Sequence, residues 1–226
     1  MSSPPRVFAI VPAAGRSRRM GIAKQLLPVG GQTMLEAVLA PLAAAPIAGI
    51  VIVTHSELAK RITAFTTRAG RSTTPLALRE GPGEGTAQED AAPPIFLAIN
   101  DDETSEMIDS VRIGLRAWSQ RTSPADHDGF LVCPADQPGI TTADFATCIA
   151  AFRQSPDKVI VATRADRRGH PLIFPAPLAA FAHSPACDNG LNALPRQHAD
   201  RVCHVPCHSP AVTRDVDTPQ DYDGLR

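Results

Sequence analysis

Short apolar runs that alternate with helical patterns constrain the fold of this chain more than any other feature. The apolar runs read as buried strands at 6–11, 49–54, 95–99, 129–133 and 158–162. Between them, apolar residues recur at helical spacing over 33–45, 56–69, 104–120 and 142–153, and Thr33 is suited to cap the first helix. Continuous apolar strands separated by helices form a mainly parallel sheet that is covered on both faces. We therefore expect an α/β fold of three layers, α/β/α.

The length and the charge of the chain exclude several classes of protein. Its 226 residues suit one domain, 1–226, and the stretch 70–94, rich in Gly, Pro, Thr and Glu, reads as an inserted loop. A net charge of −1 gives no general attraction to nucleic acid or to a membrane surface. The sequence shows neither an apolar run that could span a bilayer nor a signal-peptide layout at its start. We expect a cytoplasmic protein that binds no nucleic acid and no membrane.

The five cysteines do not suggest a disulfide framework, because their number is odd and the chain is not small. The segment 203–208, Cys-His-Val-Pro-Cys-His, offers ligands for zinc, yet no second Cys or His pair follows the spacing of zinc fingers or ribbons. Its alternating side chains favour a strand with a turn at Pro206.

The loop after the first strand gathers positive charge before the chain reaches its first acidic residue, Glu36. It starts with small residues, whose backbone N–H groups can approach an anion without obstruction. Arginine forks and a lysine ammonium, which follow, suit the oxygens of a phosphate. The spacing of the glycines fits neither a Walker A loop nor a dinucleotide-binding turn. The loop indicates a small anionic ligand, and a solvated basic surface is the alternative interpretation.

Two acidic positions could bind a divalent cation at the same edge of the sheet. Asp136 lies just past the fourth predicted strand, where parallel sheets bind their ligands. Asp217 belongs to a second acidic cluster, 215–221. Mg²⁺ usually takes one or two carboxylates from a protein. The alternative is structural: Asp136 would order a turn, and Thr218 with Pro219 would begin a helix.

Six motifs follow one another along the chain. Residues 13–24 match A-A-G-x-S-x-R-M-G-x-x-K, and residues 24–35 match K-x-x-L-P-x-x-G-x-T-x-L. The others are M-x-x-S-V-x-x-G-L at 107–115, D-x-P at 136–138, G-H-P-x-x-F at 169–174 and D-V-D-T-P at 215–219. In this order and over nearly the whole chain, they resemble the MobA-like nucleotidyltransferases, and most closely the molybdenum cofactor cytidylyltransferases.

The resemblance implies an enzyme with a Rossmann-like, mainly parallel sheet of the nucleotide-diphospho-sugar transferase type. Such an enzyme joins a nucleoside monophosphate from an NTP, here CTP or GTP, to a phosphorylated acceptor and releases pyrophosphate. The N-terminal half would bind the NTP through Ala13, Ala14, Gly15, Arg16, Ser17, Arg18, Arg19, Lys24, Ser110 and Asp136. Of these, Arg19, Lys24 and Asp136 would assist the transfer itself. Asp136 and Asp217 would bind Mg²⁺, and the C-terminal half would bind the acceptor through Gly169, His170, Pro171, Asp188 and Asn192.

Two departures from the family pattern leave the acceptor and the activity open. Glu106 stands where relatives usually carry a glycine before the 107–115 motif, and Asn192 stands where relatives often carry an arginine. Transfer of CMP to molybdopterin is the first interpretation. The second is transfer to a sugar or polyol phosphate, because 11–15 and 24–25 are similar to methylerythritol phosphate cytidylyltransferases. The third is a protein that binds a nucleotide without transferring it, as a partner of a molybdoenzyme.

Overall fold

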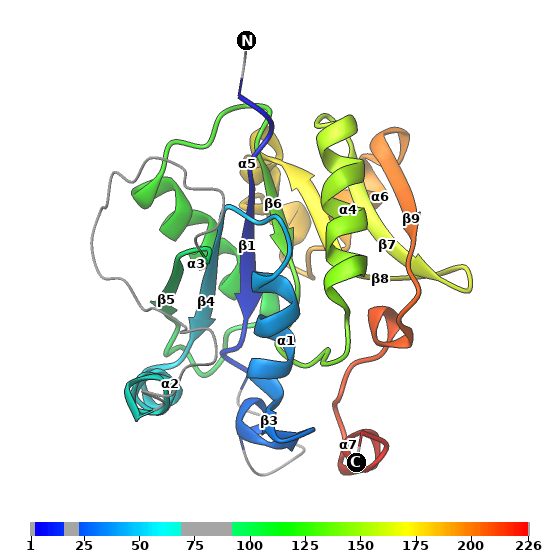
Figure 1. Ribbon diagram of the computed structural model, residues 1–226. Helices are drawn as coiled ribbons and strands as arrows, with labels where there is room; N and C mark the ends of the chain where they lie inside the picture. Colours follow the sequence, from blue (N-terminus) through cyan, green and yellow to red (C-terminus); the bar gives the residue numbers. More distant parts are fainter. Residues whose placement is uncertain (1–2, 16–22, 69–91, 226) are drawn as a thin grey trace.

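The computed structural model describes residues 3–15, 23–68 and 92–225 (Figure 1). Within these ranges a seven-stranded sheet has the order β5-β4-β1-β6-β8-β7-β9. In that order its strands are Ile95–Ile99, Gly49–Thr54, Val7–Pro12, Gly129–Val132, Arg167–Pro175, Val159–Arg164 and Val202–Pro206. All five predicted strands are present, whereas most of the predicted inserted loop, 70–94, lies outside the described residues.

The sheet is mainly parallel, as predicted. Strands β5, β4, β1 and β6 run in one direction, and β9 runs parallel to β7. Strand β8 is antiparallel to both of its neighbours, β6 and β7, and was not predicted. It follows β7 through a two-residue turn, Ala165 and Asp166, in which both residues have positive φ angles. Hairpin turns of this kind are usually Asn-Gly, Asp-Gly or Gly-Gly, and Ala165-Asp166 matches none of these pairs, so the turn could not be predicted.

The side chains of β1 alternate between two hydrophobic cores, one on each face of the sheet. Val7, Ala9 and Val11 pack with residues of helices α1 (Met34–Ala43), α2 (Ser56–Arg68) and α4 (Thr142–Gln154). Phe8 and Ile10 pack with residues of α3 (Met107–Arg121). Both cores extend across the neighbouring strands, and Figure 1 shows helices in front of the sheet and behind it. This arrangement confirms the predicted three-layer fold.

The predicted helices are present with small shifts at their ends. Thr33 caps the first helix, α1, as predicted, and Glu36 completes the capping box. Helix α3 begins at Met107 rather than at 104, because the Asp102 carboxylate binds the backbone and hydroxyl of Thr104 in a turn. Helix bounds are Met34–Ala43 (α1), Ser56–Arg68 (α2), Met107–Arg121 (α3), Thr142–Gln154 (α4), Ala179–Ala182 (α5), Ala193–Gln197 (α6) and Pro219–Asp223 (α7). No helix among the described residues is long and apolar enough to cross a membrane.

The segment 203–208 is built as a strand and not as a metal centre. Strand β9 ends at Pro206, which confirms the predicted strand. Cys207 lies beyond it with its sulfur 3.8 Å from the sulfur of Cys148 in α4, and both thiols are free and buried. Within the described ranges, no three His, Cys, Asp or Glu side chains come together as metal ligands.

The start of β1 is fixed to the loop before β6 by a buried carboxylate. Asp128 is fully buried, and it accepts hydrogen bonds from the backbone N–H of Arg6 at 2.8 Å and from the Arg6 guanidinium at 2.6 and 3.1 Å. The backbone N–H of Ala125 donates to it as well, at 2.8 Å. Burial alone would raise the pKa of Asp128, but these hydrogen bonds outweigh burial and lower it below the usual value.

We expect Asp128→Ala to lower the free energy of unfolding by about 2 kcal/mol at pH 7, because several buried donors lose their acceptor. A carboxylate with a lowered pKa stabilises the folded state above its unfolded pKa, and this contribution is lost as the pH falls through the folded pKa. Urea unfolding at several pH values would therefore show a difference in the free energy of unfolding between wild type and variant that decreases below about pH 4. A difference that is independent of pH would contradict the assigned role. Asp126→Ala, at an exposed position of the same loop, is the control.

Candidate nucleotide-binding and transfer site

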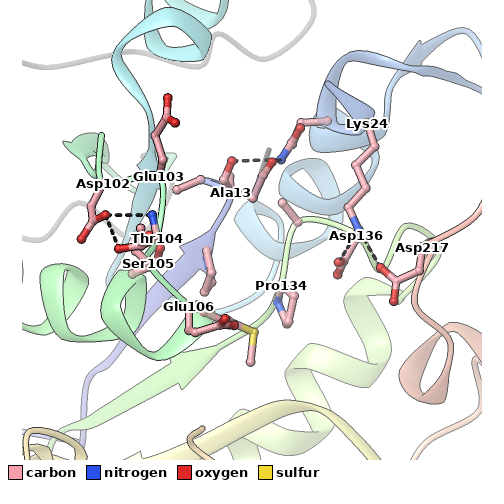
Figure 2. A pocket seen from close by; sticks show the side chains of 17 residues that line it. Ala13, Lys24, Asp102, Glu103, Thr104, Ser105, Glu106, Pro134, Asp136 and Asp217 are labelled. Atoms are coloured by element: carbon pink, nitrogen blue, oxygen red, sulfur yellow. Dashed lines mark hydrogen bonds and ion pairs between the residues drawn. The ribbon is translucent and has the colours of Figure 1, made fainter. Parts of the chain in front are cut away.

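A cavity of about 470 Å³ opens where β1, β5 and β6 end (Figure 2). Parallel strands end at the same edge of a sheet, so the loops that follow them meet there. The loops after β1, β5 and β6 all line the cavity, through residues 13–15, 102–106 and 134–136. Lys24, Gln25 and Asp217 complete the lining on one side, and Met107 and Ser110 of α3 complete it on the other.

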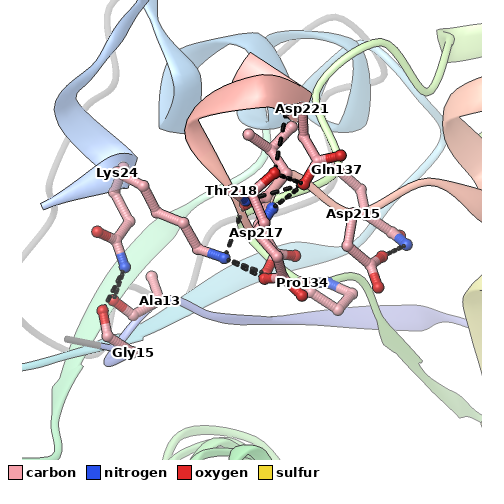
Figure 3. Close-up of polar contacts among 12 residues, drawn as sticks. Ala13, Gly15, Lys24, Pro134, Gln137, Asp215, Asp217, Thr218 and Asp221 are labelled. Atoms are coloured by element: carbon pink, nitrogen blue, oxygen red, sulfur yellow. Dashed lines mark hydrogen bonds and ion pairs between the residues drawn. The ribbon is translucent and has the colours of Figure 1, made fainter. Parts of the chain in front are cut away.

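Lys24, Asp136 and Asp217 form what we call the carboxylate end of the cavity. The Lys24 ammonium lies 2.8 Å from Asp136 Oδ2 and 2.9 Å from Asp217 Oδ1, and it donates to the Val216 carbonyl at 3.0 Å (Figures 2 and 3). Burial alone would lower the pKa of Lys24, but the two carboxylates outweigh burial and raise it. Lys24 is therefore a fixed positive charge at neutral pH.

The backbone of the basic loop is attached to Gln25, which is 2% exposed. Its Nε2 donates to the carbonyl oxygens of Ala13 at 3.0 Å and Gly15 at 2.8 Å (Figure 3). These bonds fix the chain just past β1 against the short 3-10 helix Lys24–Leu26. The same helix carries Lys24, so Gln25 links the start of the loop to its lysine.

The C-terminal segment is attached to the loop after β6. The backbone N–H of Val216 donates to the Asp136 carbonyl at 2.9 Å, and Gln137 donates through its side chain to Asp215 (Figure 3). Thr218 caps α7 in a capping box, as predicted, and the residue before it, Asp217, faces Lys24. The structural and functional interpretations of this cluster are therefore compatible, because different residues carry them.

The opposite side of the cavity, which we call the hydroxyl end, consists of Ser105, Ser110, Glu106 and Met107. Ser110 is buried in the first turns of α3, and Ser105 precedes the helix. Asn100 lies behind both serines and donates from Nδ2 to Ser105 Oγ at 3.0 Å and to Ser110 Oγ at 3.1 Å. Glu106 and Met107 are exposed at the cavity rim.

The structure brings six of the predicted site residues to this cavity: Ala13, Ala14, Gly15, Lys24, Ser110 and Asp136, together with the predicted metal ligand Asp217. Four others, Arg16, Ser17, Arg18 and Arg19, lie outside the described residues. The predicted acceptor residues Gly169, His170, Pro171, Asp188 and Asn192 do not line it. Their proposed contact with an acceptor stays a prediction.

Three of these acceptor residues have local environments of their own. His170 is near Asp215 and Asp136, and burial lowers its pKa although both carboxylates oppose this. Gly169 faces Val212 so closely that a Cβ atom would lie 1.8 Å from the Val212 carbonyl oxygen. Asp188 forms an ion pair with Arg112 of α3, at 2.6 Å. The last contact connects the helix of the hydroxyl end to the C-terminal half.

Sequence reasoning missed Gln25, Asn100 and the side chains at 102–105. The position of Asn100, one residue after an apolar strand, was an available signal, because ligands bind beyond the carboxyl ends of parallel strands. Gln25 was included in a motif without a role. Its two carbonyl partners lie more than nine residues earlier in the chain, and no local pattern indicates such bonds.

The model of the MobA-like NTP transferase domain family matches residues 9–202. The chain belongs to this family. The match and the fold place the protein among the nucleotidyltransferases, which confirms the resemblance found in the motifs. The match includes the loops after β1, β5 and β6 and excludes the segment that carries Asp217.

Individual relatives are consistent with the family. A 2-C-methyl-D-erythritol 4-phosphate cytidylyltransferase from Xanthomonas euvesicatoria pv. vesicatoria is 53% identical over 49 residues, which are 20% of this chain and 19% of the relative. A crystal structure of an rv0371c homologue from mycobacterium sp. strain JC1 has 25% identity and a TM-score of 0.67, with 97% and 94% of the two chains covered. A nucleotidyl transferase from Methanothermobacter thermautotroptrophicus shares the fold, with 20% identity, a TM-score of 0.68 and coverage of 98% and 96%.

We expect Gln25→Ala to lower the free energy of unfolding by about 1–2 kcal/mol, because two backbone carbonyls lose their donor. The variant should also weaken nucleotide binding, because the loop after β1 is no longer fixed. Urea unfolding and calorimetric titration with an NTP would measure the two effects. Gln32→Ala is the control, since that glutamine is exposed. Equal behaviour of the two variants would exclude the assigned role of Gln25.

Proposed function

We propose that this MobA-like protein is a Mg²⁺-dependent nucleotidyltransferase that transfers CMP from CTP to a phosphorylated acceptor, molybdopterin, and releases pyrophosphate. A molybdoenzyme would receive the product. The observation that carries the proposal is the cavity at the ends of β1, β5 and β6, with a cation and two carboxylates at one end and hydroxyl groups at the other. A nucleoside triphosphate has the matching order of parts, with charged phosphates at one end and a polar base at the other.

The carboxylate end fits a Mg²⁺ ion. One oxygen of Asp136, Oδ1, is buried and has no hydrogen-bond partner in the part of the chain that the structure describes. A buried carboxylate oxygen without a donor is costly unless a cation binds it. Asp217 is nearby and half exposed, so it can add a second ligand oxygen. When bound, Mg²⁺ would neutralise phosphate charge and stabilise the departing pyrophosphate.

The residues of this chain would promote transfer by charge and position. An oxygen of the acceptor phosphate attacks the α-phosphorus of CTP, and the bond from the α-phosphorus to the oxygen that bridges to the β-phosphate breaks. The acceptor is already ionised, so no protein base is needed. Lys24 supplies a permanent positive charge next to the phosphates, and the backbone of 13–15 offers N–H groups where side chains are small. The basic residues Arg16, Arg18 and Arg19 would add to this charge.

We expect Asp136→Asn to lower the rate of pyrophosphate release by about 100-fold or more. The removal of one group that stabilises charge in a transition state typically has an effect of this size. The assay contains CTP, Mg²⁺ and molybdopterin, and the product is identified by its mass. Circular dichroism should show an intact fold, since the Asp136 side chain is partly exposed and asparagine has nearly the same shape. Asp126→Asn, at an exposed position in the loop that precedes β6, is the control, because Asp136 lies beyond the opposite end of that strand. Full activity of Asp136→Asn would exclude the proposed metal ligand.

A polyol phosphate is the second candidate acceptor. The identity of 53% over 49 residues with a 2-C-methyl-D-erythritol 4-phosphate cytidylyltransferase favours it. The same assay, run with molybdopterin and with methylerythritol phosphate, decides between the two acceptors, because the masses of the cytidylylated products differ. A product formed with methylerythritol phosphate and none with molybdopterin would replace the first proposal, whereas tight binding of CTP without any product would favour a partner protein that does not transfer.

A further inference from the structure

Asn100 does not line the cavity, yet it contacts two residues that do. It follows β5 directly and is 6% exposed. Its backbone N–H donates to the Thr54 carbonyl at 2.8 Å, which fixes its main chain to the end of β4. Its side-chain amide donates to the hydroxyl oxygens of Ser105 and Ser110 at 3.0 and 3.1 Å. One amide group therefore contacts both hydroxyl groups of the hydroxyl end.

These two hydrogen bonds set the polarity of the serines. A hydroxyl group can donate or accept, and it rotates to suit its partner. Because each serine oxygen already accepts a hydrogen bond from Asn100, its own proton points elsewhere and one acceptor lone pair remains. Among the described residues, neither serine has an acceptor for that proton. Both residues line the cavity, so the proton of each serine is available to a ligand that binds there.

We propose that Asn100 is a positioning residue that makes the site prefer CTP over UTP. This inference rests on the proposed function, since it concerns the base of the NTP. Cytosine and uracil have the same ring and differ in hydrogen-bond polarity. Cytosine has two adjacent acceptors, O2 and N3, followed by an amino group, whereas the N3 of uracil carries a hydrogen. The two serine protons can therefore pair with O2 and N3 of cytosine, whereas the N3–H of uracil can use only the remaining lone pair of one serine and leaves the proton of that serine without an acceptor.

Glu106 also favours cytosine over uracil. It lines the cavity next to Ser105 and Ser110, and its carboxylate can only accept. The amino group of cytosine can donate to it, whereas the O4 of uracil would be repelled. The departure of this chain from the family glycine at position 106 thus acquires a chemical role in base choice. A site built around fixed polar groups rejects a mismatched base more strongly than an apolar pocket does.

The test is the variant Asn100→Asp, which replaces the amide that donates to both serines by a carboxylate of nearly the same shape. A carboxylate only accepts, so both serines would donate to it and turn their lone pairs toward the base. Calorimetric titrations with CTP and UTP, each with Mg²⁺, give the ratio of the two Kd values. We expect wild type to prefer CTP, and the ratio to fall about tenfold or more in the variant, as expected for one lost and one gained hydrogen bond. Gln154→Glu makes the same chemical change at an exposed position of α4 and should leave the ratio unaltered.

The possible outcomes separate this inference from the proposed function. Wild type that binds no NTP would overturn the proposed function itself. Wild type that prefers CTP, with an Asn100→Asp variant that keeps the same ratio or loses both nucleotides equally, would overturn the inference alone. If Asn100→Asp does not fold, Ser105→Ala and Ser110→Ala test the same donors, and each should lower the ratio. Unchanged ratios in both serine variants would also overturn it.

Discussion

The ammonium group of Lys24 joins three parts of the chain that are far apart in sequence. It contacts Asp136 after β6, and it contacts Asp217 and the Val216 carbonyl in the C-terminal segment. Two carboxylates so close to one another repel unless a cation lies between them. Lys24 thus stabilises the C-terminal segment in its position beside the loop after β6. The formal charge of these three side chains is negative, which would favour the Mg²⁺ ion that we propose for this end of the cavity.

The rest of the cavity is arranged around this fixed charge. The sheet brings the loops after β1, β5 and β6 to one edge, and each loop supplies a different kind of group. The first supplies small residues and Lys24, the second supplies hydroxyl groups and carboxylates, and the third supplies Asp136. Hydrogen bonds from Gln25 and Asn100, which are both buried, set the positions of these groups from behind. Preorganisation of this kind favours charge stabilisation without rearrangement during the reaction.

Much of this architecture could be predicted from the sequence, because it depends on local patterns. Apolar runs and helical spacing were sufficient for the strands, the helices and the layers, and Thr33 and Thr218 were recognised as caps. Strand β8 could not be recognised, because its turn has unusual residues and its first half is polar and exposed. The hydrogen-bond partners of Gln25 and Asn100 could not be predicted either. Hydrogen bonds across loops depend on how the elements pack, and no spacing in the chain records them.

The two halves of the chain are coupled more closely than a division into nucleotide and acceptor halves suggests. Strand β8 belongs to the C-terminal half, and its Gly169 lies directly under the backbone of Val212, where any side chain would collide. Val212 is in the 3-10 helix Pro210–Thr213, which leads into the segment that carries Asp215 and Asp217. The close approach at Gly169 therefore sets the path by which Asp217 reaches Lys24. Gly169, which the resemblance assigns to acceptor binding, therefore has a structural role, since it helps to build the carboxylate end of the nucleotide cavity.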